Sequence, residues 1–433
     1  MSRGQGGWVR MTIAGRTTPP SGGDTSVTEA GRHAGVLPPE AFPAWPMWSD
    51  SEQRNLLAAL QSGAWAGSRA RQTHRFAADF AAFHDSPHGI AMSNGTTTLE
   101  AALVALGVGE GDEVILPALT FVATASAVLR VGATPVLVDV DADSLCLRAD
   151  LADAAVTSRT RAMVTVHLAG ATGDLDALVE VSRRHGIALV EDCAHAHGSR
   201  WRGRGVGSFG AFGSFSFQQS KLMTAGEGGV LVTGDRALAD AAWGFANGGR
   251  DAAGTTYHHP SIGTNSRMTE WQGAVLSAQL DRYAEQCALR DANGRALAAA
   301  LAEIPGLCAQ ARDPRQDTQG YYSFVVHFRA DEFPTLGRDH LNQLMIERGI
   351  PMVQPYPSLT QLEVFSRRSF APTRRRLSAS FRAEPAPVAE SAAGATLWIH
   401  HRALLASRDT VLRIADICDD IRTDPARRRA GSR

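Results

Sequence analysis

The chain has 433 residues, 44% apolar and 20% charged, which is enough to bury one large core or two smaller ones. Its 43 lysines and arginines nearly balance its 44 aspartates and glutamates, which argues against nucleic acid or an anionic membrane as a partner. Because five scattered cysteines form no CxxC pair and no apolar run suggests a signal peptide or a membrane span, we expect a protein of the reducing cytoplasm.

The two ends of the chain differ from its middle. Residues 1–36 are rich in Gly, Ser, Thr and Arg without periodicity, so we expect a disordered N-terminal extension there. A helix is predicted from Ser51, with this serine as its N-cap, and a second helix over 71–84. Residues 426–433 are predicted to form a frayed basic tail.

From Ile90 onward, short β-rich runs alternate with helical ones. The predicted strands cover 90–93, 113–117, 134–140, 162–167, 187–192, 213–217 and 229–234. The predicted helices between them cover 99–107, 121–130 and 175–186. Because these strands are apolar on both faces and joined by helices, they predict an α/β fold with a mostly parallel sheet, in which the last strand could pair antiparallel.

A long amphipathic helix over 268–301, with a break expected near Gly294, then links this large domain to a second one. A strand over 321–328 and helices over 337–349 and 409–422 indicate a smaller C-terminal α+β domain. We therefore predict a large domain over 37–285 and a small domain over 286–425.

Polar side chains follow several of the predicted strands. In open α/β sheets, ligands bind at the carboxyl ends of the strands. SNGTTTLE follows the first strand and opens a helix, so Gly95 and Thr96 could hold a phosphate at a helix N-terminus, although Ser-Asn-Gly is also an ordinary helix cap.

IALVEDCAHAHG ends an apolar strand with two carboxylates and two histidines. Asp192 at this strand end could pair with a protonated ring nitrogen. A metal site on Asp192, His195 and His197 is the rival interpretation, but no HExxH or EF-hand spacing supports it. The structural alternative is that one histidine caps a loop and the other packs in the core.

The stretch GSFSFQQSKLMTAGEGG places Lys221 just beyond a predicted buried strand. Phe215 and Phe217 alternate with serines, so Ser216 faces the site if the phenylalanines are core residues. Lys221 could be an exposed loop residue or a nucleophile that forms a Schiff base. A phosphate cradle, a strand-end carboxylate, a histidine and this lysine together are the parts that pyridoxal phosphate requires.

EDCAHAHGS, GSFSFQQSKLMTAGEGGVLVTGD and GTNSRMTEWQGAVL resemble the DegT/DnrJ/EryC1/StrS aminotransferases, which are fold type I pyridoxal-phosphate enzymes. The resemblance runs from about residue 42 to 421. Within the family, FPAWP, DCAHAHG, FSFQ..KLMTAGEGG and LWIHHRALL most resemble the 3-amino-5-hydroxybenzoate synthase branch, whose relatives include sugar and cyclitol aminotransferases of antibiotic pathways.

The resemblance assigns roles to individual residues. It implies Lys221 as the Schiff-base lysine and proton shuttle, Asp192 as the partner of the pyridine nitrogen, and His195 as a neighbour of the cofactor's phenolic oxygen. It implies that Phe121 stacks on the cofactor ring. The phosphate contacts that it implies are Gly95, Thr96 and Ser216. It also implies a homodimer with shared active sites, in which the neighbouring subunit donates Asn265 to the phosphate.

The resemblance implies an aminotransferase that transfers an amino group from glutamine or glutamate to a keto sugar, a ketocyclitol or a related carbocycle in antibiotic biosynthesis. The alternative is an enzyme of the aminohydroxybenzoate synthase type, in which Lys221 removes a proton from an aminated dehydroshikimate, water is lost and an aromatic ring results. A non-catalytic regulator with the same fold is a further alternative. WGFANGGR and GAWAG depart from the patterns of the family on the substrate side, so they bear on the acceptor and not on the cofactor.

Overall fold

The computed structural model describes residues 35–251, 257–333, 336–366 and 381–423. The chain divides into two units, residues 1–33 and 34–433, and the first lies wholly outside the described residues. The predicted N-terminal extension, apart from its last two residues, and the predicted basic tail therefore fall outside the described part of the chain.

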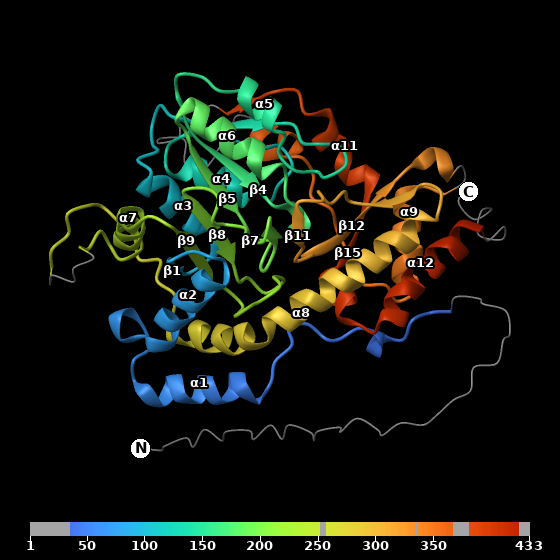
Figure 1. Ribbon diagram of the computed structural model, residues 1–433, viewed down its shortest axis with the longest axis horizontal. Coiled ribbons are helices and arrows are strands. Elements are labelled where there is room, and N and C mark those ends of the chain that lie inside the picture. The colour runs from blue at the N-terminus through green and yellow to red at the C-terminus, as the bar shows by residue number, and fades with distance from the viewer. Residues whose placement is uncertain (1–34, 252–256, 334–335, 367–380, 424–433) are drawn as a thin grey trace, which may run out of the picture. The chain divides into compact units, whose positions relative to one another are not determined.

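An eight-stranded sheet with the order β1-β9-β8-β5-β4-β2-β3-β14 lies at the centre of the second unit (Figure 1). Its strands are β1 (His88–Met92), β2 (Glu113–Pro117), β3 (Thr134–Val138), β4 (Thr160–Val166), β5 (Ala188–Asp192), β8 (Phe212–Ser216), β9 (Gly229–Thr233) and β14 (Arg382–Ala383). Only β9 pairs antiparallel, with β1 and β8. The mostly parallel sheet and the antiparallel strand over 229–234 are thereby confirmed.

Helices pack on this sheet, and their ends follow local capping signals. They are α3 (Gly95–Ala105), α4 (Ala123–Arg130), α5 (Ala149–Ala154), α6 (Leu175–His185) and α7 (Arg236–Ala246). The Asn94 side chain accepts a hydrogen bond from the Thr97 N–H, so α3 begins at Gly95, where SNGTTTLE was predicted to open a helix. α6 ends at Gly186, whose φ of 62° is the left-handed conformation typical of a helix C-cap.

The N-terminal helices α1 (Asp50–Ser62) and α2 (Arg71–Phe83) pack against the long helix α8 (Glu270–Ala302). The predicted N-cap of α1 was wrong, because Ser49 forms a capping box with Glu52 and Ser51 lies within the helix.

The predicted break in α8 was also wrong, since the helix is continuous through Gly294. This glycine accommodates an aromatic side chain rather than ending the helix. A Cβ atom at that position would lie 2.6 Å from the Tyr321 ring.

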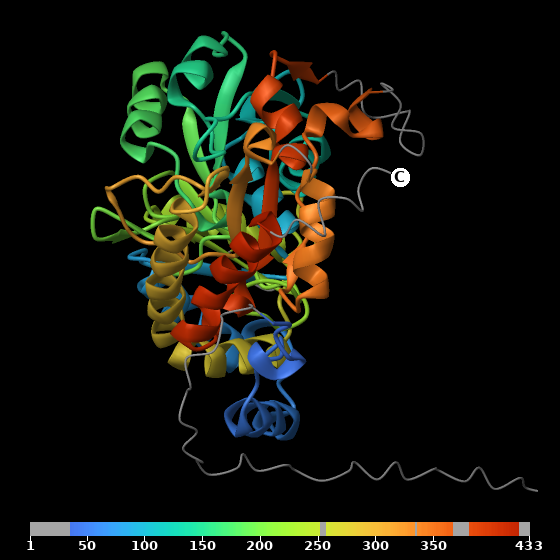
Figure 2. The same ribbon diagram turned by 90° about the vertical axis from the view of Figure 1, so that its right-hand side faces the viewer.

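A four-stranded antiparallel sheet, β10-β12-β15-β13, forms the C-terminal part of the fold. Its strands are β10 (Leu307–Ala309), β12 (Ser323–Phe328), β13 (Met352–Val353) and β15 (Thr396–His400). Figure 2 shows two helices of this part, α9 (Arg338–Glu347) in orange and α12 (Arg408–Thr423) in red. Both contribute buried residues to one apolar cluster with this sheet.

The remaining elements are short. They are β6 (Arg200–Trp201), β7 (Arg204–Gly205), β11 (Gln316–Thr318), α10 (Glu363–Ser366), α11 (Pro387–Ala395) and the 3-10 helices η1 (Pro39–Ala41), η2 (Gly67–Arg69), η3 (Leu168–Gly170), η4 (Ala330–Glu332), η5 (Leu359–Gln361) and η6 (His401–Leu405). Because α8 crosses residue 285 and β14 joins the large sheet, the division at 285/286 stays a prediction. Among the described helices, none is long and apolar enough to cross a membrane.

Candidate active site

A cavity of about 730 Å³ opens where β4, β5 and β8 end. Its wall contains seven of the eight residues that the sequence singled out for the cofactor: Gly95, Thr96, Phe121, Asp192, His195, Ser216 and Lys221. The eighth, Asn265, is exposed and does not line this cavity. Local sequence patterns from four separate segments therefore converge on one site.

Lys221 lies in the turn that follows β8, and its backbone N–H donates to the Gln218 carbonyl. The turn continues through Gly226, whose φ of 81° is strained for any other residue. Lys221 is only 8% exposed, and this burial lowers the pKa of its amine, although Tyr322 and Asp192 oppose the shift. A buried amine of lowered pKa is available as a nucleophile and as a base.

Lys221 is also the only lysine among the 433 residues; all the other basic residues counted with it are arginines. An arginine stays charged and cannot serve as a nucleophile at ordinary pH. The sole lysine of the chain thus occupies the cavity.

Asp192 is the last residue of β5, and its carboxylate faces the same cavity. Its Oδ2 accepts a hydrogen bond from the Thr124 hydroxyl at 2.9 Å, and its Oδ1 accepts one from the Ala194 N–H at 3.2 Å. Burial raises the pKa of Asp192, although these hydrogen bonds and Lys221 oppose the shift. A cationic ligand would therefore gain a desolvated, oriented carboxylate as its partner.

His195 presents a defined tautomer to the cavity. Its Nδ1 accepts a hydrogen bond from the Ala169 N–H at 3.3 Å. Burial, with smaller effects of Lys221 and His197, holds the pKa of His195 well below its usual range, so the ring is neutral. The proton of a neutral ring with an accepting Nδ1 lies on Nε2, which is 3.4 Å from the Tyr356 hydroxyl. His195 can therefore donate a hydrogen bond toward the cavity.

The N-terminus of α3 forms another part of the wall. Gly95 lies against Ser216 so closely that a Cβ atom on Gly95 would be 2.6 Å from the Ser216 Cβ. Ser216 projects from β8 on the face opposite the fully buried Phe215 and Phe217, as their alternation predicted. The helix N-terminus and two hydroxyl side chains, Thr96 and Ser216, suit an anionic group such as a phosphate.

Sequence reasoning missed many residues of the wall, among them Thr124, Tyr322 and Tyr356. Thr124 lay inside a segment predicted only as a helix, and Tyr322 and Tyr356 lie in C-terminal segments without any motif. The Lys221 Nζ lies 4.4 Å from the centroid of the Tyr322 ring. No signal in the sequence pointed to the two tyrosines, because aromatic residues beside strands usually belong to the core.

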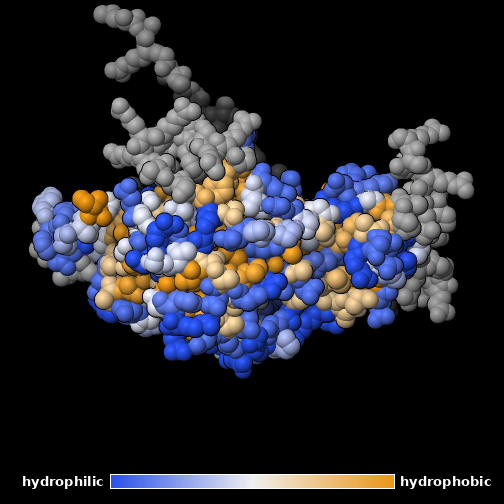
Figure 3. Space-filling model, turned by 90° about the horizontal axis from the view of Figure 1, so that it is seen from above, coloured by the Kyte–Doolittle hydropathy of each residue, from blue (hydrophilic) through white to orange (hydrophobic). Residues whose placement is uncertain are grey.

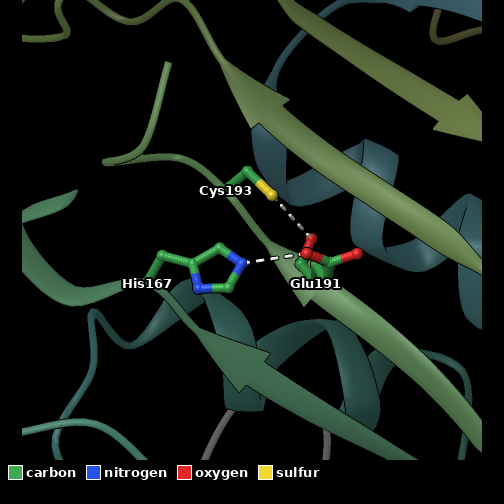
Figure 4. A group of neighbouring side chains, drawn as sticks. All are labelled: His167, Glu191 and Cys193. Carbon is green, nitrogen blue, oxygen red and sulfur yellow. Dashed lines mark hydrogen bonds and ion pairs between the residues drawn. The ribbon is translucent and has the colours of Figure 1, made fainter. Parts of the chain in front are cut away.

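The possible metal ligands that the structure brings together differ from those considered in the sequence. His197 is fully buried among aromatic rings and does not line the cavity. Instead His167, Glu191 and Cys193 place their side-chain ligand atoms within 4.8 Å of one another (Figure 4).

The hydrogen bonds of this cluster hold a loop against the sheet. The Glu191 carboxylate accepts from the His167 Nε2 at 3.1 Å and from the N–H groups of Gly207, Phe209 and Gly210. Burial raises the pKa of the Cys193 thiol well above its usual range, which opposes the thiolate form that zinc binds. Glu191 therefore anchors the 207–210 loop to β5, one residue before Asp192.

The comparisons with known proteins show the family of the chain. The model of the DegT/DnrJ/EryC1/StrS aminotransferase family matches residues 47–418. The chain is 38% identical to 3-amino-5-hydroxybenzoate synthase of Amycolatopsis mediterranei over 381 residues, which are 88% of this chain and 97% of that protein. It is 39% identical to L-glutamine:scyllo-inosose aminotransferase of Streptomyces griseus over 396 residues, 86% of this chain and 92% of that one.

A crystal structure of 3-amino-5-hydroxybenzoic acid synthase is similar to the fold with a TM-score of 0.79 and 36% identity, and the match covers 88% of this chain and 98% of that one. Full-length similarity of this degree accompanies a common fold and a common family. The chain therefore belongs to the DegT/DnrJ/EryC1/StrS aminotransferase family.

Proposed function

We propose that this enzyme uses pyridoxal phosphate to transfer an amino group from glutamine or glutamate to the ketone of a ketocyclitol, a keto sugar or a related carbocycle. The observation that carries the proposal is the sole lysine of the chain, buried in one cavity with the strand-end carboxylate of Asp192. The five cysteines are free and four are buried, which suits a reducing compartment such as the cytoplasm.

The residues of the cavity fit pyridoxal phosphate. Lys221 would hold its carbonyl carbon, Asp192 its pyridine nitrogen, and the α3 N-terminus with Ser216 its phosphate. The close contact of Gly95 with Ser216 supports this fit, because it leaves no space for a larger residue in the phosphate cradle. When bound, this group supplies an aldehyde that captures amines and a ring that accepts electrons.

The residues of the chain then have separate tasks. Lys221 takes the proton from the Cα of the amino donor and returns a proton to the aminated carbon of the acceptor. Asp192 would keep the ring nitrogen of the cofactor protonated. His195 would donate its Nε2–H to the phenolic oxygen of the cofactor, and Phe121 would stack on the cofactor ring.

The acceptor is argued from the rest of the wall. Uncharged hydrogen-bonding side chains make up much of it: Thr120, Gln218, Ser220, Tyr322 and Tyr356. Such groups match the hydroxyls of a polyhydroxylated ring. Several relatives at 36–39% identity are named L-glutamine aminotransferases of scyllo-inosose or its deoxy and amino derivatives, which supports glutamine as donor and a ketocyclitol as acceptor.

A second candidate is the aminohydroxybenzoate synthase reaction, which the 38% identical relative favours. The two are separated by incubating the purified enzyme with α-¹⁵N-glutamine and scyllo-inosose, and in parallel with an aminated dehydroshikimate. We expect a ¹⁵N-labelled aminocyclitol in the first reaction. An aromatic product in the second reaction alone would establish the second candidate. No turnover with any keto sugar, ketocyclitol or dehydroshikimate would favour a regulator.

The phosphate cradle leads to a prediction about Gly95→Ala. The added Cβ must displace Ser216, and overpacking of this kind costs about 1–3 kcal/mol, so affinity for pyridoxal phosphate should fall about tenfold or more. The dissociation constant is measured by equilibrium dialysis of the cofactor. Gly234→Ala, where no atom lies within 4 Å of the new Cβ, is the matched control. Equal affinity of the two variants would contradict the cradle.

A homodimer with shared active sites is part of the proposal. Asn265 is exposed outside the cavity of its own chain, so it is free to reach the site of a second copy. Figure 3 shows apolar patches between polar regions on one face of the molecule. Large apolar side chains that are more than half exposed include Trp48, Leu57, Leu60, Trp65, Phe121 and Ile262. Burial of such side chains between two copies would stabilise a dimer.

Shared sites predict complementation between two impaired variants. Lys221→Ala chains and Asn265→Asp chains should each be poorly active, since aspartate at 265 repels the phosphate of the partner's cofactor. In a mixed dimer one site carries both defects and the other is intact, so activity should partly return after subunit exchange. Exchange demonstrated by mass spectrometry without recovery of activity would place Asn265 in no shared site.

A further inference from the structure

Tyr322 contacts Lys221, His195 and Ser220 at the wall of the cavity. Its ring lies under the amine of Lys221, with the Nζ 4.4 Å from the ring centroid. The imidazole of His195 stacks on the same ring, with centroids 3.9 Å apart and planes inclined by 13°. The hydroxyl of Tyr322 lies 2.9 Å from the Ser220 Oγ. Its ring is thus held by stacking and by a hydrogen bond at its edge.

The direction of that hydrogen bond follows from its neighbours. The Ser220 hydroxyl donates its single proton to the Gln218 Oε1 at 2.8 Å. It must therefore accept from Tyr322, whose hydroxyl is the donor. Ser220 directly precedes Lys221, so the tyrosine is connected to the same turn that carries the lysine.

The groups that face the lysine come from several elements. They are Asp192 at the end of β5, His195 and His197 in the loop after it, Tyr322 before β12, and Tyr356, which contacts Tyr322 and His195. Burial holds the pKa values of both histidines well below their usual range, so both rings are neutral. Of these groups, Asp192 and the π face of Tyr322 are the ones that favour a charged amine.

We propose that Tyr322 is a positioning residue for Lys221: its ring holds the ε-amino group at the cavity wall and favours the ammonium form, so that Tyr322 sets the pH at which the amine becomes free. The inference rests on the proposed role of Lys221 as the lysine that binds the cofactor and transfers the proton. A lysine that takes a proton from a substrate carbon is an ammonium immediately afterwards. The ring of Tyr322 stabilises this ammonium. Because the ring carries no negative charge, it does not keep the proton on the amine permanently.

The composition of the chain makes this proposal directly measurable. Full-length protein prepared without cofactor and labelled with [ε-¹³C]lysine contains one labelled side chain, Lys221. The pH dependence of its single ¹³C resonance gives the pKa of Lys221 in the folded protein. The measurement needs no catalytic turnover, so it stands apart from the identity of the substrate.

Two substitutions at Tyr322 separate the ring from the hydroxyl. Tyr322→Phe keeps the π face, and we expect the pKa of Lys221 to be unchanged. Tyr322→Leu removes the π face, and we expect that pKa to fall by about one unit and kcat to fall about tenfold with a smaller change in KM. Tyr257→Leu, at an exposed tyrosine outside the cavity, should leave the pKa of Lys221 unchanged and serves as the control.

The outcomes are decisive in both directions. An unchanged or higher pKa in Tyr322→Leu, or an equal fall in Tyr322→Phe, would overturn the proposal. If Tyr322→Leu does not fold, Tyr322→Met provides a longer apolar side chain and the same expectation. Borohydride reduction and peptide mapping of the holoenzyme then test the cofactor role of Lys221 separately, so failure of the proposed function and failure of this inference give different results.

Discussion

Lys221→Ala should lower the rate of amino transfer by at least about a thousand-fold, because it removes both the nucleophile that binds the cofactor and the base that moves the proton. The variant should still bind pyridoxal phosphate reversibly, since Asp192, Ser216 and the N-terminus of α3 remain. Reduction of the wild-type holoenzyme with borohydride should fix a pyridoxyl group on the peptide that contains Lys221. Because the chain has no other lysine, the mass spectrum is unambiguous.

The stability of a second substitution, Lys221→Met, distinguishes a lost catalytic group from a lost fold. Burial lowers the pKa of Lys221 in the folded protein, so between the folded and the unfolded pKa the unfolded chain binds more protons and stability rises with pH. Below that window the buried charge opposes folding. Lys221→Met without cofactor should therefore unfold at the same temperature as the wild type or higher. A large drop in the midpoint, or a pyridoxyl group found away from Lys221, would contradict the assignment.

Asp192→Asn should lower turnover by about a thousand-fold while the protein folds normally. An amide can accept from the Ala194 N–H and donate to the Thr124 hydroxyl, so both local hydrogen bonds can be kept. It cannot hold a ring nitrogen in its protonated form, so the cofactor would no longer accept electrons efficiently. The measurement is the rate of a single turnover with saturating cofactor.

Thr124→Val is the matched control for Asp192. It removes one hydrogen bond to the carboxylate and leaves the charge in place, so we expect about a tenfold loss of turnover. Near-native activity of Asp192→Asn would make Asp192 a structural residue of the β5 end. Equal losses in both variants would show that orientation of the carboxylate, and not its charge, is what the reaction requires.

Sequence patterns were sufficient where the information is local. Short apolar runs, alternating with segments of helical periodicity, predicted the strands β1 to β5 and the parallel sheet. The alternation of Phe215, Ser216 and Phe217 predicted which side chain faces the cavity. The error at the start of α1 has a local cause as well. Two serines, Ser49 and Ser51, compete as caps, and only Ser49 has a glutamate three residues later to close the capping box.

Non-local contacts could not be predicted in this way. Tyr356 lies 161 residues from His195, and Tyr322 lies 102 residues from Ser220. Neither carries a local motif, and their places at the wall depend on how the C-terminal part of the chain packs beside the large sheet. The continuity of α8 through Gly294 has the same origin, because the reason for the glycine is the ring of Tyr321 in a later segment.

The sequence by itself therefore determined the fold class, through the periodicity of its strands and helices, and the family, through the resemblance of its motifs. It also predicted the site residues at the strand ends, because the loops after the strands are contiguous stretches of sequence. Only the tertiary structure decided the state of those residues. Lys221 is buried with a lowered pKa, and His195 is neutral with its proton on Nε2, because neighbours from distant segments remove water from them and leave specific hydrogen bonds. Desolvation depends on all surrounding atoms, so it cannot be derived from any single stretch of the chain.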